Sequence, residues 1–241
     1  MNKCLFFTTP PRPLLREGNY PYLLLNFFSY RYLFKNNNWK LAIVDSAVEH
    51  WFRKLKLNDY PKDFFKKWEE IAKILYDNFG ERVWITIPDY PDDYYQGLCY
   101  ENGKDNVDKT LENIKKFIKL KGCWMPVIQS NYKNIKRFEE SAMLVKEIVG
   151  DYPRVAIGTV CKVRDGKFIV ECCKIARKYF KNSWIHAFGL TIKYLDKVKE
   201  YINSFDSLAW TSFKKYKNSS NEKYWYFFEY IKRVENIINK T

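Results

Sequence analysis

The chain has 241 residues, of which 46% are hydrophobic and 19% aromatic, so one large domain can bury a substantial core. No segment has the unbroken apolar length that crosses a bilayer, and the apolar patch within residues 1–7 is too short for a signal peptide. These features argue against a membrane protein, and we expect a cytoplasmic one.

Basic residues dominate the charge of the chain. It has 42 Lys and Arg residues against 28 Asp and Glu residues, which gives a net charge of +14 and a pI of about 9.3. Such a high pI is typical of proteins that bind nucleic acid, the partner that we expect. A lysine-rich chain from an A/T-rich genome would show the same excess on solvated helices, and this alternative stays open.

The cysteines and histidines do not form a metal-binding pattern. Six cysteines are scattered along the chain without a C-x-x-C pair, and it has only two histidines. This spacing favours reduced thiols over a disulfide framework or a zinc site. We therefore expect neither a metal nor another cofactor.

Strand-length apolar runs alternate with stretches of helical periodicity. The predicted strands are residues 3–8, 22–28, 40–45, 83–87, 124–129, 154–159, 184–188 and 207–210. The predicted helices are residues 61–79, 107–121, 134–149, 166–180, 192–202 and an aromatic-rich C-terminal helix at about 222–239. Four prolines between positions 10 and 21 leave little room for a helix between the first two strands.

This alternation predicts an α/β fold with a parallel sheet. Eight strands in a chain of this length indicate a shortened (β/α)8 TIM barrel whose first helix is reduced or missing. A doubly wound sheet is the alternative, although no G-x-G-x-x-G or P-loop motif follows any strand. No linker divides the chain, so residues 1–241 are predicted to form a single domain.

Several predicted strands run into a polar residue or a glycine. The carboxyl ends of parallel strands share one edge of the sheet, and ligands bind at that edge. The pattern therefore predicts a site built from Asp45-Ser46, Asp89, Gln129-Ser130, Gly158-Thr159 and Gly189.

The aspartates at this edge have structural alternatives. Asp45 suits a catalytic group and the N-cap of a helix over residues 47–55 equally well. Asp89 lies between two prolines and beside aromatic residues suited to base stacking, which favours a functional role over an Asp/Pro turn. With Asp92 and Asp93 it would also suit the divalent metal of a nuclease.

The remaining candidates are weaker one by one. Gln129 ends an apolar run, and its amide can read the edge of a planar base. Gly158 and Gly189 suit a close approach of the backbone to a ligand, or simply a turn. His186 lies mid-strand between apolar neighbours, which favours an interior histidine.

Near the C-terminus, Asp206 precedes an apolar stretch, so its spacing alone indicates a turn residue. Lys214, Lys215 and Lys217 follow and are interleaved with aromatic residues. This pattern suits the backbone and bases of a nucleic acid, or else a solvated loop.

Taken in order, these motifs resemble those of the tRNA-guanine transglycosylase superfamily. The chain is most similar to its shortened, divergent members that exchange guanine in DNA for a 7-deazaguanine, the DpdA-like transglycosylases. The matching segments, between about residues 40 and 212, are Asp45-Ser46, Pro88-Asp89, Val127-Ile128-Gln129, Ala156-Ile157-Gly158, His186-Ala187-Phe188-Gly189 and Phe205-Asp206-Ser207.

The resemblance implies a pentosyltransferase on a (β/α)8 barrel. It would replace guanine in nucleic acid, DNA favoured over tRNA, with a free 7-deazaguanine such as preQ0, alongside partner proteins of a DNA modification system. Asp206 would be the nucleophile and Asp45 the second catalytic aspartate. The base-binding residues would be Ser46, Asp89, Gln129 and Gly158.

The chain also departs from the family pattern. Ala47-Val48 replace two glycines, Glu49 stands where the family has a stacking aromatic residue, and the C-x-C-x-x-C zinc cluster is absent. These changes argue against a tRNA substrate and a zinc-stabilised dimer. Two other functions stay open: a non-catalytic nucleic-acid-binding barrel, and a metal-dependent nuclease that uses the Asp cluster.

Overall fold

The computed structural model describes residues 4–36, 38–91, 103–131, 133–161, 163–211 and 220–240. All strand pairs between these residues are parallel. One sheet has the order β1 (Leu5–Phe7), β9 (Ser204–Asp206), β8 (Trp184–Ala187), β7 (Arg154–Ile157), β6 (Val127–Ile128). The other has the order β2 (Tyr22–Asn26), β3 (Leu41–Asp45), β4 (Val83–Thr86), β5 (Trp124–Met125).

The two sheets adjoin each other at both of their edges. Only Pro126 separates β5 from β6, and its carbonyl still accepts a hydrogen bond from the Ala156 N–H at 2.8 Å. At the other edge, Thr8 forms an isolated parallel bridge with Leu23, and the Leu24 N–H donates to the Thr8 carbonyl at 3.0 Å. A cluster of buried side chains from both sheets lies between them: Phe7, Ile43, Trp84, Met125, Val127 and Ala156.

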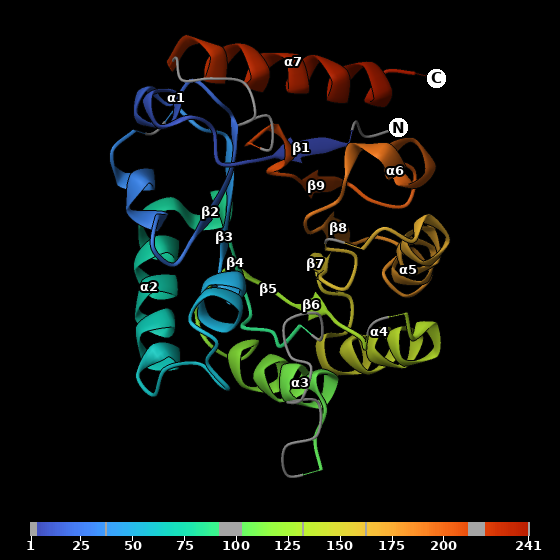
Figure 1. The fold of residues 1–241 in the computed structure, drawn as a ribbon. Coiled ribbons are helices and arrows are strands. Elements are labelled where there is room, and N and C mark those ends of the chain that lie inside the picture. The colour runs from blue at the N-terminus through green and yellow to red at the C-terminus, as the bar shows by residue number, and fades with distance from the viewer. Residues whose placement is uncertain are drawn as a thin grey trace.

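Helices surround the strands (Figure 1). The connections contain α1 (Arg12–Glu17), η1 (Tyr30–Phe34), η2 (Glu49–Lys54), α2 (Phe64–Phe79), η3 (Gly80–Arg82), α3 (Asn106–Phe117), α4 (Ile135–Val149), α5 (Gly166–Tyr179) and α6 (Ile192–Val198). The last helix, α7 (Ser220–Ile238), lies outside β1, where the rings of Tyr230 and Phe6 are 5.6 Å apart. None of the described helices is long and apolar enough to cross a membrane.

Apolar spacing and capping explain where the long helices form. In α2, the buried side chains Phe64, Trp68, Ile71, Ala72 and Leu75 recur every three or four residues along one face. Asp105 caps α3 in a reciprocal pair of bonds with Asp108, and Asn134 and Asp165 cap α4 and α5. These local signals fix the helix starts close to their predicted positions.

The structure confirms the predicted α/β fold of parallel strands and alternating helices. The first helix is reduced to the six residues of α1, because prolines crowd that connection. The predicted strand at residues 207–210 is wrong: the last strand is Ser204–Asp206, and it pairs with both β1 and β8. The predicted strand at residues 124–129 is interrupted at Pro126, which has no N–H to donate.

Candidate functional site

One cavity of about 560 Å³ opens at the carboxyl ends of the strands. Seven of the residues that line it come from the ends of seven different strands or follow them within three residues, and they are Asn26, Asp45, Asp89, Gln129, Gly158, Gly189 and Asp206. The polar strand ends of the sequence therefore meet in one place. A cavity of this size suits a small ligand such as a nucleobase with its sugar.

Asp206, at the end of β9, is held by two donors. Its Oδ1 atom accepts a hydrogen bond from the Gly189 N–H at 2.9 Å and lies 3.3 Å from Nε2 of His186. Both contacts go to the same oxygen, and no donor among the described residues contacts Oδ2. Only 6% of Asp206 is exposed, so its carboxylate is fixed in place with one oxygen left for a ligand.

Behind Asp206 lies a series of hydrogen bonds from β8 and β9. The Trp184 indole N–H donates to Ser204 Oγ at 2.7 Å, and Ser204 Oγ is 2.9 Å from Nδ1 of the buried His186. With Trp184 as its donor, the Ser204 hydroxyl can itself donate to Nδ1, which places the ring proton on Nε2, facing Asp206. The expected interior histidine is thus a direct partner of the candidate nucleophile.

Asp45, at the end of β3, is bound by the chain that follows it. Its Oδ2 accepts the Ala47 N–H at 3.0 Å, and Ala47 adopts a left-handed conformation with φ 66°. Asp45 does not cap the next helix, since η2 begins at Glu49 and no side chain caps it. Burial, together with the negative charges of Asp89 and Asp206, raises the pKa of Asp45 from 3.8 to about 7, against the opposing effect of the backbone N–H groups of Ala47 and Ser46.

Asp89 and Gln129 form a pair on the cavity wall. The Gln129 amide nitrogen donates to Asp89 Oδ2, while its oxygen accepts a bond from Thr159 Oγ1 at 3.2 Å. These two contacts fix which end of the amide faces Asp89. Burial raises the pKa of Asp89 to about 6, against the opposing effect of the Gln129 amide.

Gly158 leaves the space that this amide occupies. A Cβ atom at residue 158 would lie 2.2 Å from Nε2 and 2.7 Å from Cδ of Gln129. A larger residue would therefore push the amide away from Asp89. Gly189 is restricted in a different way, because it has φ 60° and a Cβ there would lie 2.4 Å from Cys161 Sγ.

Three predicted and described site residues, Ser46, Ser130 and Thr159, do not line the cavity. The side chain of Ser46 is fully buried, its N–H donates to Thr86 Oγ1 at 2.9 Å, and its Oγ is 3.2 Å from the Tyr60 hydroxyl. The Tyr60 hydroxyl also donates to the Asp89 carbonyl at 2.9 Å. Ser46 thus links the ends of β3 and β4 behind the cavity wall.

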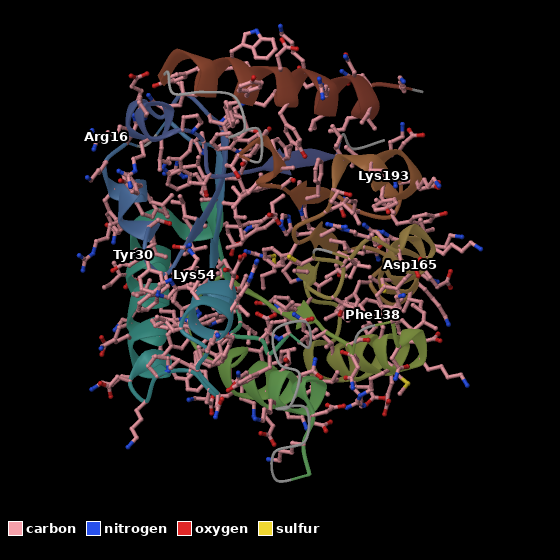
Figure 2. All side chains as sticks on the ribbon, in the orientation of Figure 1. Arg16, Tyr30, Lys54, Phe138, Asp165 and Lys193 are labelled. Atoms are coloured by element: carbon pink, nitrogen blue, oxygen red, sulfur yellow. The ribbon has the colours of Figure 1, made fainter. Side chains whose placement is uncertain are left out.

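The structure adds lining residues that the sequence pattern missed: Thr9, Asn26, Phe28, His50, Lys54, Cys161, Phe188 and Leu208. Of these, Asn26 had a usable signal, because it is a polar residue within the apolar run of β2. Lys54 stands at the end of η2 (Figure 2) and is exposed. Its position could not be read from helical spacing, since η2 is a π-helix.

Several predicted residues lie outside the described part of the chain. They are Asp92, Asp93, Lys214, Lys215 and Lys217. Within the described residues, no group of three or more His, Cys, Asp or Glu side chains is arranged to hold a metal ion.

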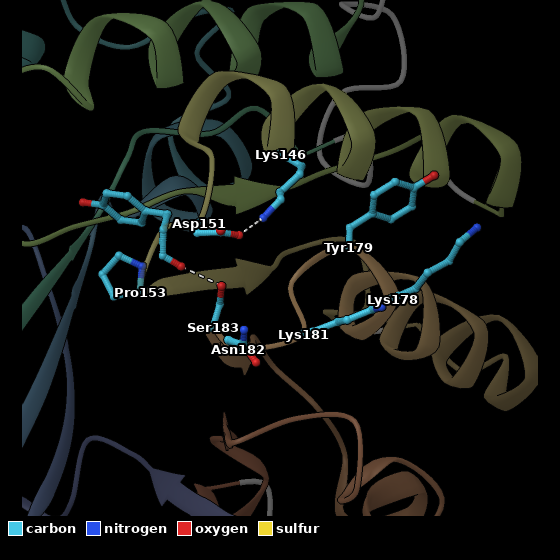
Figure 3. A pocket seen from close by; sticks show the side chains of 9 residues that line it. Lys146, Asp151, Pro153, Lys178, Tyr179, Lys181, Asn182 and Ser183 are labelled. Carbon is cyan, nitrogen blue, oxygen red and sulfur yellow. Dashed lines mark hydrogen bonds and ion pairs between the residues drawn. The ribbon is translucent and has the colours of Figure 1, made fainter.

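A second depression, of about 290 Å³, lies near the amino ends of β7 and β8 (Figure 3). Two of its lysines are already in ion pairs, Lys146 with Asp151 and Lys178 with Glu139. Its Ser183 hydroxyl donates to the Tyr152 carbonyl at 2.6 Å. These polar groups are occupied by the protein itself, so the cavity with the three aspartates is the better candidate site.

Neither a protein-family model nor a curated protein sequence matches this chain.

Proposed function

We propose that the protein is a transglycosylase that replaces guanine in nucleic acid, DNA favoured, with a 7-deazaguanine such as preQ0. The observation that carries the proposal is the meeting of Asp45, Asp89, Asp206 and the Gln129 amide in one cavity. Two carboxylates beside one sugar carbon suit a double displacement, and a paired carboxylate and amide suit the edge of a base.

The proposal includes a closed barrel. Counting the interrupted β5 and β6 as one strand, the nine strands become eight, and the Thr8–Leu23 bridge joins β2 to the end of β1. We infer that the two sheets form one (β/α)8 barrel around the shared cluster of buried side chains. The cavity would then be the mouth of the barrel, at the carboxyl ends of its strands.

Asp206 is the proposed nucleophile. One of its oxygens attacks C1′ of the target nucleotide, so that a C1′–O bond forms while the C1′–N9 bond to guanine breaks. The contacts of Gly189 and His186 with Oδ1 support this assignment, because they orient the carboxylate and leave Oδ2 for the sugar. The product is a covalent aspartyl-sugar ester and a departing guanine.

Asp45 is the proposed acid and base. A carboxyl group with a pKa of about 7 is partly protonated at neutral pH, so it can protonate the leaving guanine. The carboxylate formed then takes the N9 proton of the incoming 7-deazaguanine as that nitrogen attacks C1′. The C1′–O bond to Asp206 breaks, and both aspartates return to their starting states.

Asp89 and Gln129 are the proposed base readers. The edge of guanine offers N–H donors beside a carbonyl acceptor, which fits a carboxylate beside an amide N–H. The Gln129 amide N–H donates to Asp89, so the two side chains hold each other at the cavity wall. Gly158 keeps the amide in place at the wall.

The substrate is proposed to be a polynucleotide because the net charge of +14 favours phosphate. DNA is favoured over tRNA because the zinc cluster of the tRNA-modifying relatives is absent from the sequence. The target nucleotide must leave the base stack to reach an enclosed cavity. Lys214, Lys215 and Lys217 are proposed phosphate contacts from the sequence pattern alone.

The test is release of labelled guanine from DNA or tRNA in the presence of preQ0, with incorporation of preQ0 measured by nucleoside analysis. Asp206→Asn is expected to abolish release, and Asp45→Asn to slow it strongly. Far-ultraviolet circular dichroism checks that both variants fold. Release by Asp206→Asn at the wild-type rate would reject the nucleophile.

The two other functions give different results in the same assay. Tight binding of nucleic acid with no release of guanine by the wild-type protein would indicate a non-catalytic barrel. Cleavage of the backbone that requires Mg²⁺ or Mn²⁺ would indicate a nuclease.

A further inference from the structure

An exposed aromatic side chain stands on the rim of the cavity. Phe28 follows β2, and 51% of it is exposed although it lines the cavity. Its ring is 4.3 Å from the ring of His50 and 5.0 Å from that of Trp51, centroid to centroid. An aromatic ring supported by other rings and open to solvent is suited to stack against a base.

The turn that carries Phe28 is held by its own polar groups. Asn26 Oδ1 accepts bonds from the Phe28 N–H at 3.1 Å and from Ser29 Oγ at 3.0 Å. The neighbouring Phe27 donates its N–H to the Asp45 carbonyl at 2.9 Å and packs its ring against Trp51. These contacts fix the rim to the catalytic strand β3, so Phe28 is exposed by a well-anchored turn.

The charged side chains that line the cavity determine where a phosphate group can bind. Asp45, Asp89 and Asp206 make the interior of the cavity negative, which excludes a phosphate group. Among the described lining residues, Lys54 is the sole lysine or arginine. The acidic Glu49 on the same helix is paired with Arg53 at 2.8 Å.

We propose that Phe28, His50 and Lys54 form a nucleotide-binding rim, which holds the nucleotide next to the one being exchanged. The base of that neighbour stacks on Phe28, beside His50, and its phosphate contacts Lys54. The inference rests on the proposed function, and it specifies the substrate: an unpaired or locally extruded strand of a polynucleotide, in preference to a free nucleoside.

The experiment uses a single-stranded oligonucleotide with 2-aminopurine beside the target guanine, made once as DNA and once as RNA. Stacking on an aromatic ring quenches 2-aminopurine fluorescence, and anisotropy of a terminal dye reports affinity. Phe28→Ala is expected to abolish the quenching and weaken binding about tenfold. Lys54→Gln is expected to weaken binding several-fold and to lower the slope of log K against log salt by about one.

Two matched variants control for general effects on the surface. Phe34 is 45% exposed and contacts Phe79 outside the cavity, so Phe34→Ala should bind and quench as the wild type does. Lys40 precedes β3 at its amino end, so Lys40→Gln should leave the affinity nearly unchanged.

Guanine release, measured in the same samples, separates the two proposals. If Phe28→Ala quenches the 2-aminopurine fluorescence as strongly as the wild type does, the proposed nucleotide-binding rim is wrong, whatever the rate of base exchange. If the quenching depends on Phe28 but the wild type releases no guanine, the nucleotide-binding rim is supported and the proposed transglycosylase function is wrong. Weaker binding by Phe34→Ala equal to that of Phe28→Ala would also overturn the rim.

Discussion

Nε2 of His186 lies 3.3 Å from Oδ1 of Asp206, and both side chains are buried. The ring is held from its other side by Ser204, whose hydroxyl also accepts the Trp184 indole N–H. Three residues of β8 and β9 thereby orient a carboxylate at the end of β9. Such support keeps a reacting group within the narrow range of geometry that catalysis needs.

Removal of this support should slow base exchange with little loss of binding. We expect His186→Ala to lower kcat for guanine release by about 100-fold, because Asp206, the proposed nucleophile, would lose its approach to C1′. Ser204→Ala should lower it by about tenfold, since the ring keeps its place but loses the partner that sets its tautomer. Steady-state kinetics should show the change in kcat, with KM nearly constant.

Rescue by a conservative variant distinguishes orientation from folding. His186→Gln retains an N–H donor near the position of Nε2, so it should recover part of the rate lost in His186→Ala. A loss of rate in both variants that follows their loss of thermal stability would mean that His186 acts only in the core.

Stability should fall as pH rises through the weakly acidic range. Asp45 keeps its proton in the folded state up to about pH 7, whereas in the unfolded chain it ionises near 3.8. The folded state therefore binds more protons between these limits, and the free energy of unfolding decreases with pH by at most about 4 kcal/mol. Urea unfolding of the wild type and Asp45→Asn, from about pH 4 to pH 7, should show a flatter profile for the variant.

An exposed aspartate serves as a control, because its contribution to the pH dependence of stability has the opposite sign. Its ion pair with Lys146 lowers the pKa of Asp151, so this group contributes stability that is lost as pH falls through its folded-state pKa. Asp151→Asn should leave the decrease above about pH 4 intact. Identical profiles for the wild type and Asp45→Asn would contradict the raised pKa of Asp45.

The polar ends of the strands could be predicted because their position follows from one physical rule. Parallel strands buried on both faces read as apolar runs, and all of their carboxyl ends lie on one edge. Asp45, Asp89, Gln129 and Gly158 each follow such a run, and all four line the cavity. The continuous apolar runs therefore predict which residues lie at this edge, but they do not predict the distances between their side chains.

The last strand, β9, could not be predicted by the same rule because it contains a buried polar residue. Ser204 is fully buried and bonds to Trp184 and His186, so β9 does not read as an apolar run. The apolar stretch that follows Asp206 drew the prediction to residues 207–210. The hydrogen bonds of Ser204 to the neighbouring strand β8 account for this buried polar residue, and the spacing of residues within one strand cannot show them.

The rim residues could not be predicted for a related reason. Phe28 lies in the predicted strand 22–28, but the turn bonds of Asn26 end β2 earlier. Ala47 adopts a positive φ that favours glycine, and the bond of its N–H to Asp45 accompanies that conformation. At both positions a side chain at the end of the preceding strand, Asn26 or Asp45, accepts a backbone N–H two residues further on, and this hydrogen bond overrides the local propensity.

A single methyl group at residue 158 should impair base recognition. Gly158→Ala would place its Cβ 2.2 Å from Gln129 Nε2, so the amide must move away from Asp89. We expect KM for the incoming 7-deazaguanine to rise about tenfold or more, with a smaller effect on kcat, because base contacts are lost. Isothermal titration with the free base should show the same loss of affinity.

Thr159→Val provides a graded comparison. It removes the bond at 3.2 Å to the Gln129 oxygen but leaves the amide its place, so its effect on KM should be smaller than that of Gly158→Ala. Unchanged affinity in Gly158→Ala would show that the Gln129 amide does not read the base.

A thiol on the cavity wall offers a chemical test of the site. Cys161 lines the cavity and is partly exposed, whereas Cys4, Cys123, Cys172 and Cys173 are buried and burial raises the pKa of each. Iodoacetamide should therefore label Cys161 well before these four. An adduct beside Gly189, whose N–H binds Asp206, should block guanine release.

Protection and substitution separate this effect from damage elsewhere. Free guanine or preQ0 should slow the labelling of Cys161, measured by mass spectrometry of its peptide. Cys161→Ser should release guanine at close to the wild-type rate and keep that rate after iodoacetamide treatment, since serine fills the same space without the reactive sulfur. A fully labelled wild-type protein that still releases guanine at its original rate would place the reaction outside this cavity.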